Sequence, residues 1–173
     1  MSISHLSLVN QKLAYAGAII RQLTESPPPK TLERQALVDA AVFHLAMGLH
    51  FYLRELAEHH RIKNLSAIYS VQDLISALQQ SESTSSESSE LLSLAQTNST
   101  WLYNLTGYYT RLSQSPEKPK EKKAFGQENL IELIELTEVD EPPPEKLTPE
   151  LLASWLDSFR ALIVRQRGTS AEY

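Results

Sequence analysis

The chain has 173 residues, of which 42% are hydrophobic and 21% charged, so it is long enough for one domain with a hydrophobic core. Its net charge of -5 argues against a general nucleic-acid-binding protein, because neutralising phosphates requires a basic surplus. The absence of cysteine excludes disulfides, thiolate metal sites and cysteine nucleophiles.

Two long helices are predicted in the first third of the chain. Over residues 4–25, apolar side chains recur at alternating spacings of three and four, which places one apolar stripe on one side of a helix. Prolines at 27–29 end this helix, because a residue before proline is pushed out of the α region. The second helix spans residues 31–60 and is apolar on nearly every side over 40–53, so we expect it to form the centre of a bundle.

Three shorter helices are predicted next. Ser70 and Asp73 form a capping box that opens a helix reaching about Gln79. Residues 81–89 are rich in Ser and Glu and carry little apolar surface, so they are predicted to form a mobile linker. Two helices follow, and Gly107 weakens the second while allowing close packing. Their expected inner sides consist of Leu91, Leu92, Leu94 and Ala95, and then Trp101, Leu102, Leu105, Tyr108, Tyr109 and Leu112.

A second linker and an extended segment are predicted before the last helix. The linker covers residues 115–128 and holds the one basic cluster of the chain, SPEKPKEKK. Over 130–139 the apolar residues recur in a pattern that suits neither helix nor strand. They are too dense to remain in solvent, so we expect an extended strap that lies on a groove of the same bundle in preference to a second copy. The strap residues are Leu130, Ile131, Leu133, Ile134 and Leu136.

The last helix is predicted from its caps. Thr148 is the N-cap, Pro149 occupies the first helical position, and Gly168 is the expected C′ residue. Trp155 lies in the middle of its apolar face. Taken together, the elements predict an all-α, up-and-down bundle of five or six helices, forming a single domain over residues 1–173.

The strongest chemical motif is RELAEHH, residues 54–60. An arginine separated from a histidine by four to six residues resembles the signature of HEPN-type helical ribonucleases, in which arginine holds phosphate and histidine performs acid–base chemistry. Arg54 with His59 or His60 fits that pattern. However, positions five apart on a continuous helix point about 140° apart, and chance alone supplies roughly 0.7 such matches in this composition. The favoured interpretation is a solvated helix end.

No metal or cofactor site is predicted. Glu55 and His59 have the spacing of two ligands on one helix, but no histidine has a glutamate three residues before it, and HExxH is absent. A surface ion pair is the better interpretation of these two residues. His44 and His50 lie within the apolar run, where we expect neutral, hydrogen-bonded structural histidines.

Location and partners follow from composition. The N-terminus has no basic stretch followed by an unbroken apolar run, and the apolar run at 40–53 is too short to cross a bilayer. We therefore expect a cytoplasmic protein without a membrane partner. A protein partner, or a second copy of the chain, is more plausible than nucleic acid.

Several short motifs together resemble a small family of unknown function from pseudomonad-type gammaproteobacteria. They are NQKL followed by AG at 10–17, AVFHL at 41–45, STWL at 99–102, Trp155, and the final Glu172-Tyr173. The resemblance implies a bacterial, mainly helical protein and carries no catalytic residue across. The predicted function is a non-enzymatic interaction or accessory protein, with a ribonuclease-like domain using Arg54 and His59 as the alternative.

Overall fold

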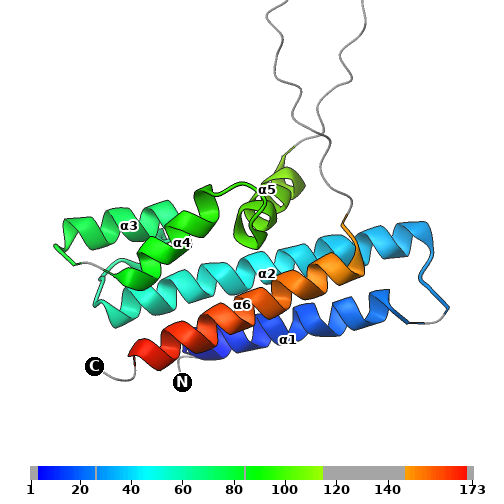
Figure 1. Ribbon diagram of the computed structural model, residues 1–173, viewed down its shortest axis with the longest axis horizontal. Helices are drawn as coiled ribbons and strands as arrows, with labels where there is room; N and C mark the ends of the chain where they lie inside the picture. The colour runs from blue at the N-terminus through cyan, green and yellow to red at the C-terminus, as the bar shows by residue number, and fades with distance from the viewer. Residues whose placement is uncertain (1–3, 26, 84, 115–146, 171–173) are drawn as a thin grey trace, which may run out of the picture.

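The computed structural model describes residues 4–25, 27–83, 85–114 and 147–170, and these residues form helices and their connections. Three long helices, α1, α2 and α6, run side by side, while three shorter ones pack together along α2 (Figure 1). The predicted all-α bundle is thus confirmed. The helices are α1 (His5–Leu23), α2 (Thr31–His59), α3 (Val71–Gln80), α4 (Ser86–Gln96), α5 (Trp101–Ser113) and α6 (Pro149–Ser170), with a short 3-10 turn at Leu65–Ala67.

Helix α2 is the centre of the core, as its composition predicts. Its Leu45, Tyr52 and Leu53 side chains are fully buried. At Gly48, an added Cβ would lie 3.2 Å from a Leu13 methyl of α1 and 3.5 Å from the Phe159 ring of α6. The missing side chain therefore allows α1 and α6 to approach α2 closely.

The helix starts follow the predicted capping chemistry. Ser70 and Asp73 form the predicted capping box at the start of α3. At the start of α6, the Thr148 hydroxyl accepts a hydrogen bond from the Leu151 backbone N–H at 3.2 Å, and Pro149 is the first helical residue. Each cap satisfies a backbone N–H that has no partner within its helix.

The linker predicted at 81–89 is wrong over its second half. Ser85 caps α4, which begins at Ser86, and both Ser85 and Ser88 are buried. The hydroxyls of Ser88 and Ser89 donate to the Ser85 carbonyl at 2.9 and 3.0 Å. A serine whose hydroxyl donates a hydrogen bond to a nearby backbone carbonyl can be buried in a helix at little cost in free energy.

Three further expectations about single residues are wrong. Gly168 is not a C′ residue, because α6 continues to Ser170. Leu112 is 44% exposed although the apolar pattern places it on the inner side of its helix. Gly107 permits no close contact, since nothing lies within 4 Å of where its Cβ would be.

The strap at 130–139, including Leu130, Ile131, Leu133, Ile134 and Leu136, lies outside the described residues, as does the linker at 115–128. Both therefore stay predictions.

Candidate functional site

Arg54 and His59 are held on different sides of α2. The helix is continuous to His59, so the two side chains point about 140° apart. Arg54 Nε donates to the Ile68 carbonyl at 3.2 Å. The His59 ring lies instead against that of His60, 5.4 Å between centroids. The structure thus does not bring the two residues of the ribonuclease-like motif together.

Glu55 forms an ion pair between distant helices instead of the predicted pair with His59. Both of its oxygens accept hydrogen bonds from Arg167 of α6 at 2.8 Å. Arg167 also donates to the Asn10 side-chain oxygen of α1 at 3.3 Å. The bidentate, partly buried ion pair joins the end of α6 to α2, and the Asn10 hydrogen bond joins it to α1.

A buried polar network lies beside this ion pair. The Tyr52 hydroxyl donates to the side-chain oxygen of Gln166 at 2.6 Å, and the Gln166 amide donates to Glu90 of α4 at 2.8 Å. Glu90 also pairs with Arg165. Burial, followed by the charge of Glu55, raises the pKa of Tyr52 above its ordinary value. The network fixes α4 and α6 on α2, and its polar groups form hydrogen bonds with one another.

One side of α2 is only partly covered by the bundle. At 100° per residue, a group of its side chains falls within an arc of roughly 120°. The buried residues of α2 occupy the remainder of the helix surface, whereas these are half-buried or exposed, and Phe43 is 45% exposed. The group consists of Phe43, His44, Met47, His50, Phe51 and Arg54.

Aromatic rings from α1 and α5 extend this surface on both sides. Tyr15 of α1, which is 44% exposed, meets His44 edge-on at a centroid distance of 5.3 Å. Tyr109 of α5 lies 6.5 Å from Phe43 and 5.6 Å from His50. We call the surface made by these two tyrosines and the partly covered α2 residues the aromatic face.

The aromatic face carries positive charge and lacks acidic residues of its own. Lys12 lies 5.6 Å from the centre of the Tyr15 ring, and Arg54 lies 6.0 Å from that of Phe51. Neither α1, α5 nor residues 40–54 contain any Asp or Glu. Glu58, further along the same side of α2, is hydrogen-bonded to His5 at 3.0 Å.

The two histidines of the aromatic face are kept neutral. Burial, and then the charge of Lys12, lowers the pKa of His44; burial, and then Arg54, lowers that of His50. His44 Nδ1 is buried and has no hydrogen-bond partner among the described residues, contrary to the hydrogen-bonded histidine that the sequence predicts. Near neutral pH the charge of the face therefore comes from Lys12 and Arg54.

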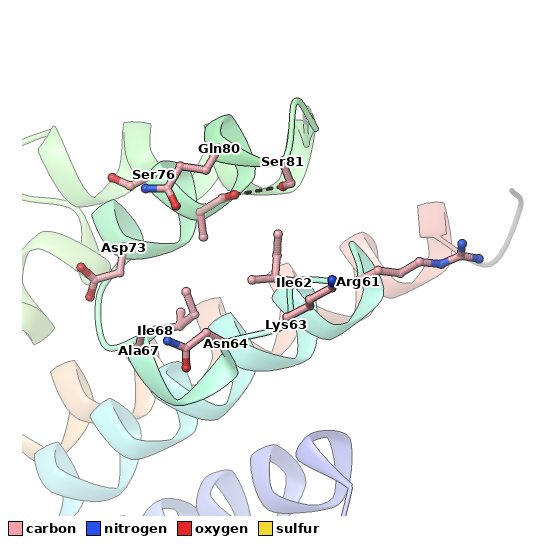
Figure 2. Close-up of a pocket in the computed structure, with 11 residues that line it drawn as sticks. Arg61, Ile62, Lys63, Asn64, Ala67, Ile68, Asp73, Ser76, Gln80 and Ser81 are labelled. Atoms are coloured by element: carbon pink, nitrogen blue, oxygen red, sulfur yellow. Dashed lines mark hydrogen bonds between the residues drawn. The ribbon is translucent and has the colours of Figure 1, made fainter.

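A pocket of about 470 Å³ lies between the connection that follows α2 and helix α3 (Figure 2). Ile62 and Ile68 contribute apolar surface to it. Three charged residues line it: Arg61, Lys63 and Asp73. Figure 2 shows the Arg61 side chain extending away from the pocket, and Asp73 accepts the backbone N–H groups of Tyr69 and Ser70 at the start of α3. The pocket therefore offers little for acid–base chemistry.

Within the described ranges, no group of three or more His, Asp or Glu side chains is arranged to hold a metal ion. Helix α2 is long and apolar enough to cross a membrane by length and composition, but half of its most apolar stretch is buried in the bundle, as in many core helices. Cytoplasmic location stays a prediction.

The sequence predicts Phe43, His44 and His50 as parts of the central helix of the bundle and gives no prediction for Tyr15. One signal was present in the sequence: residues 40–54 hold four aromatic or histidine side chains on one helical arc without any acidic residue. The contacts with Tyr15 and Tyr109 have no local signature, because they join separate helices.

Comparisons with known proteins identify a family. A family model described as a family of unknown function, DUF6586, matches residues 1–173. Neither a search of curated proteins nor a search of solved structures found a significant match. The expected resemblance to a family without assigned activity is therefore confirmed, while bacterial origin stays a prediction. Because the match spans the entire sequence, the chain belongs to the DUF6586 family of unknown function.

Proposed function

We propose that this protein is a non-enzymatic interaction protein that binds an acidic, apolar segment of a partner protein on its aromatic face. The observation that supports this most is the exposure of Phe43 of α2 and Tyr15 of α1, which are 45% and 44% exposed within a continuous group of rings. Exposed aromatic side chains gathered in one patch are typical of protein-binding surfaces.

The charge of the face selects the class of partner. Lys12 and Arg54 lie at its edges without acidic residues between them, so a segment carrying Glu or Asp beside its apolar residues would be attracted. The rings would supply the contact area, because a rigid aromatic side chain loses little conformational entropy on binding. Nucleic acid is disfavoured by the net charge of -5.

Site-specific photo-crosslinking tests the proposal in the host cell. A benzophenone amino acid is placed at Phe43 and, as the matched control, at Leu32, which is 85% exposed in the first turn of α2 and outside the face. We expect a discrete protein adduct from position 43 that is absent from position 32. Equal adducts at both positions would contradict a specific surface.

The ribonuclease-like alternative has its own test. Arg54 is bound to the Ile68 carbonyl and His59 is turned elsewhere, so purified protein should cleave RNA no faster than a buffer blank. Cleavage that is independent of metal and is lost in both Arg54→Ala and His59→Ala would replace the interaction function with an enzymatic one.

A further inference from the structure

We infer that the aromatic face binds residues 128–141 of the same chain, so that an external partner has to displace this internal segment. The inference rests on the proposed function, because it assigns an occupant to the same surface. It is carried by three features: the charges on both sides, the place where the segment leaves the bundle, and the length of chain available.

The segment is the acidic counterpart of the face. A third of the 21 acidic residues of the chain lie within residues 128–145, which contain no Lys or Arg. Glu132 and Glu135 lie between the apolar strap residues, and the other acidic residues flank them, so a single segment offers both carboxylates for Lys12 and Arg54 and apolar side chains for the rings. The acidic residues are Glu128, Glu132, Glu135, Glu138, Asp140, Glu141 and Glu145.

The attachment points favour binding within one chain. Tyr109, which contacts Phe43 and His50 on the face, lies only four residues before the end of α5 at Ser113. From Phe43 to Arg54 the face extends roughly 16 Å along α2, at about 1.5 Å per residue. Residues 115–127 alone span up to about 45 Å when extended. The segment can therefore reach the face, and its tether gives it a high effective concentration there.

Three acidic residues of α2 lie beside the face, and two of them contact a basic side chain. Asp39, at the start of the partly covered side, accepts a hydrogen bond from Gln35 at 2.8 Å, and Glu55 and Glu58 are bound to Arg167 and His5. Because the Gln35 amide is neutral, Asp39 would repel the carboxylates of an incoming segment, whereas Lys12 and Arg54 would attract them. The basic cluster SPEKPKEKK, at 115–123, precedes the segment and is separate from its acidic residues.

Engineered disulfides test this contact directly, because the chain contains no cysteine of its own. The test pair is Met47→Cys with Ile134→Cys, since Met47 lies within the partly covered arc of α2. The control pair is Val164→Cys with Ile134→Cys, since Val164 is 73% exposed on α6 and outside the face. Full-length proteins are oxidised mildly, and non-reducing electrophoresis separates crosslinked monomers from dimers, after circular dichroism has shown equal helix content.

We expect a crosslinked monomer for the test pair at several times the yield of the control pair. Adding Glu132→Gln, Glu135→Gln and Glu138→Gln to the test pair should lower that yield several-fold, as should 0.5 M salt, roughly three times physiological ionic strength. Equal yields from the two pairs would overturn the inference. A test-pair product found only as dimer would also overturn it, because the face would then be occupied by a second copy.

The outcome is distinguishable from failure of the proposed function. If the crosslink fails while the Phe43 photo-adduct with a partner persists, the face binds partners without internal competition. If both hold, the triple glutamine variant should give a stronger partner adduct from position 43 than the unmodified segment, because the competitor has been weakened.

Discussion

Replacing Tyr52 with phenylalanine tests whether the buried polar network holds α6 on α2. The Tyr52 hydroxyl donates to Gln166 at 2.6 Å, and both side chains are buried, with exposures of 0% and 4%. Removing the hydroxyl leaves the side-chain oxygen of Gln166 without this donor, away from water. Such a loss costs about 1–3 kcal/mol of unfolding free energy. At roughly 2–4 °C per kcal/mol for a chain of this size, a loss near the middle of that range lowers Tm by about 4–8 °C.

Urea unfolding followed by circular dichroism measures this loss, with an unchanged m-value as the sign that only stability has changed. The matched control is Tyr15→Phe, since Tyr15 is 44% exposed, and it should change the free energy of unfolding by less than about 0.5 kcal/mol. A Tyr52→Phe loss as small as that of the control would refute the structural role of the network.

Three other changes have defined outcomes. Trp155→Ala should cost about 3–5 kcal/mol in urea unfolding, because the ring is 2% exposed; a loss below about 1 kcal/mol would contradict its burial. Gly107→Ala should lower the entropy of the unfolded chain, which raises the free energy of unfolding by up to about 1 kcal/mol and raises Tm, since an added Cβ meets nothing within 4 Å. A lower Tm would contradict the open surroundings. His44, His50 and His60 have pKa values lowered mainly by burial, so the unfolded chain binds protons first as pH falls below 6.5. Unfolding free energy should therefore decrease with falling pH in that range, and replacing all three with Gln should flatten the decrease.

Local chemistry made much of this fold predictable. The capping box at Ser70 and the Thr148 cap were identified because each acts within a few residues of its own helix. The Ser/Glu-rich stretch failed as a linker because composition does not reveal that the serine hydroxyls bond to the Ser85 carbonyl. Gly168 failed as a helix end because glycine is permitted, not required, to stop a helix.

The candidate site was less predictable, because it is made by contacts between helices. Glu55 and Arg167 are 112 residues apart, and no spacing rule pairs them. Tyr15 meets His44 only after α1 has packed antiparallel to α2. The run at 40–53, which is apolar on nearly every side, predicts burial on several sides of the helix. One arc of that run is instead half-buried or exposed, and it forms part of the aromatic face.

The most direct test of the aromatic face uses the partner protein that photo-crosslinking identifies. This partner is purified, and its affinity for variants of the face is measured. Calorimetry would compare the unchanged protein with Phe43→Ser/Tyr15→Ser and with Leu32→Ser/Val164→Ser, a control pair exposed outside the face. Removing two aromatic contacts of about 1–2 kcal/mol each predicts a Kd raised roughly 30- to 1,000-fold, while the control pair should stay within about two-fold. A Kd equal for all three proteins would contradict the assignment of this face as the interaction surface.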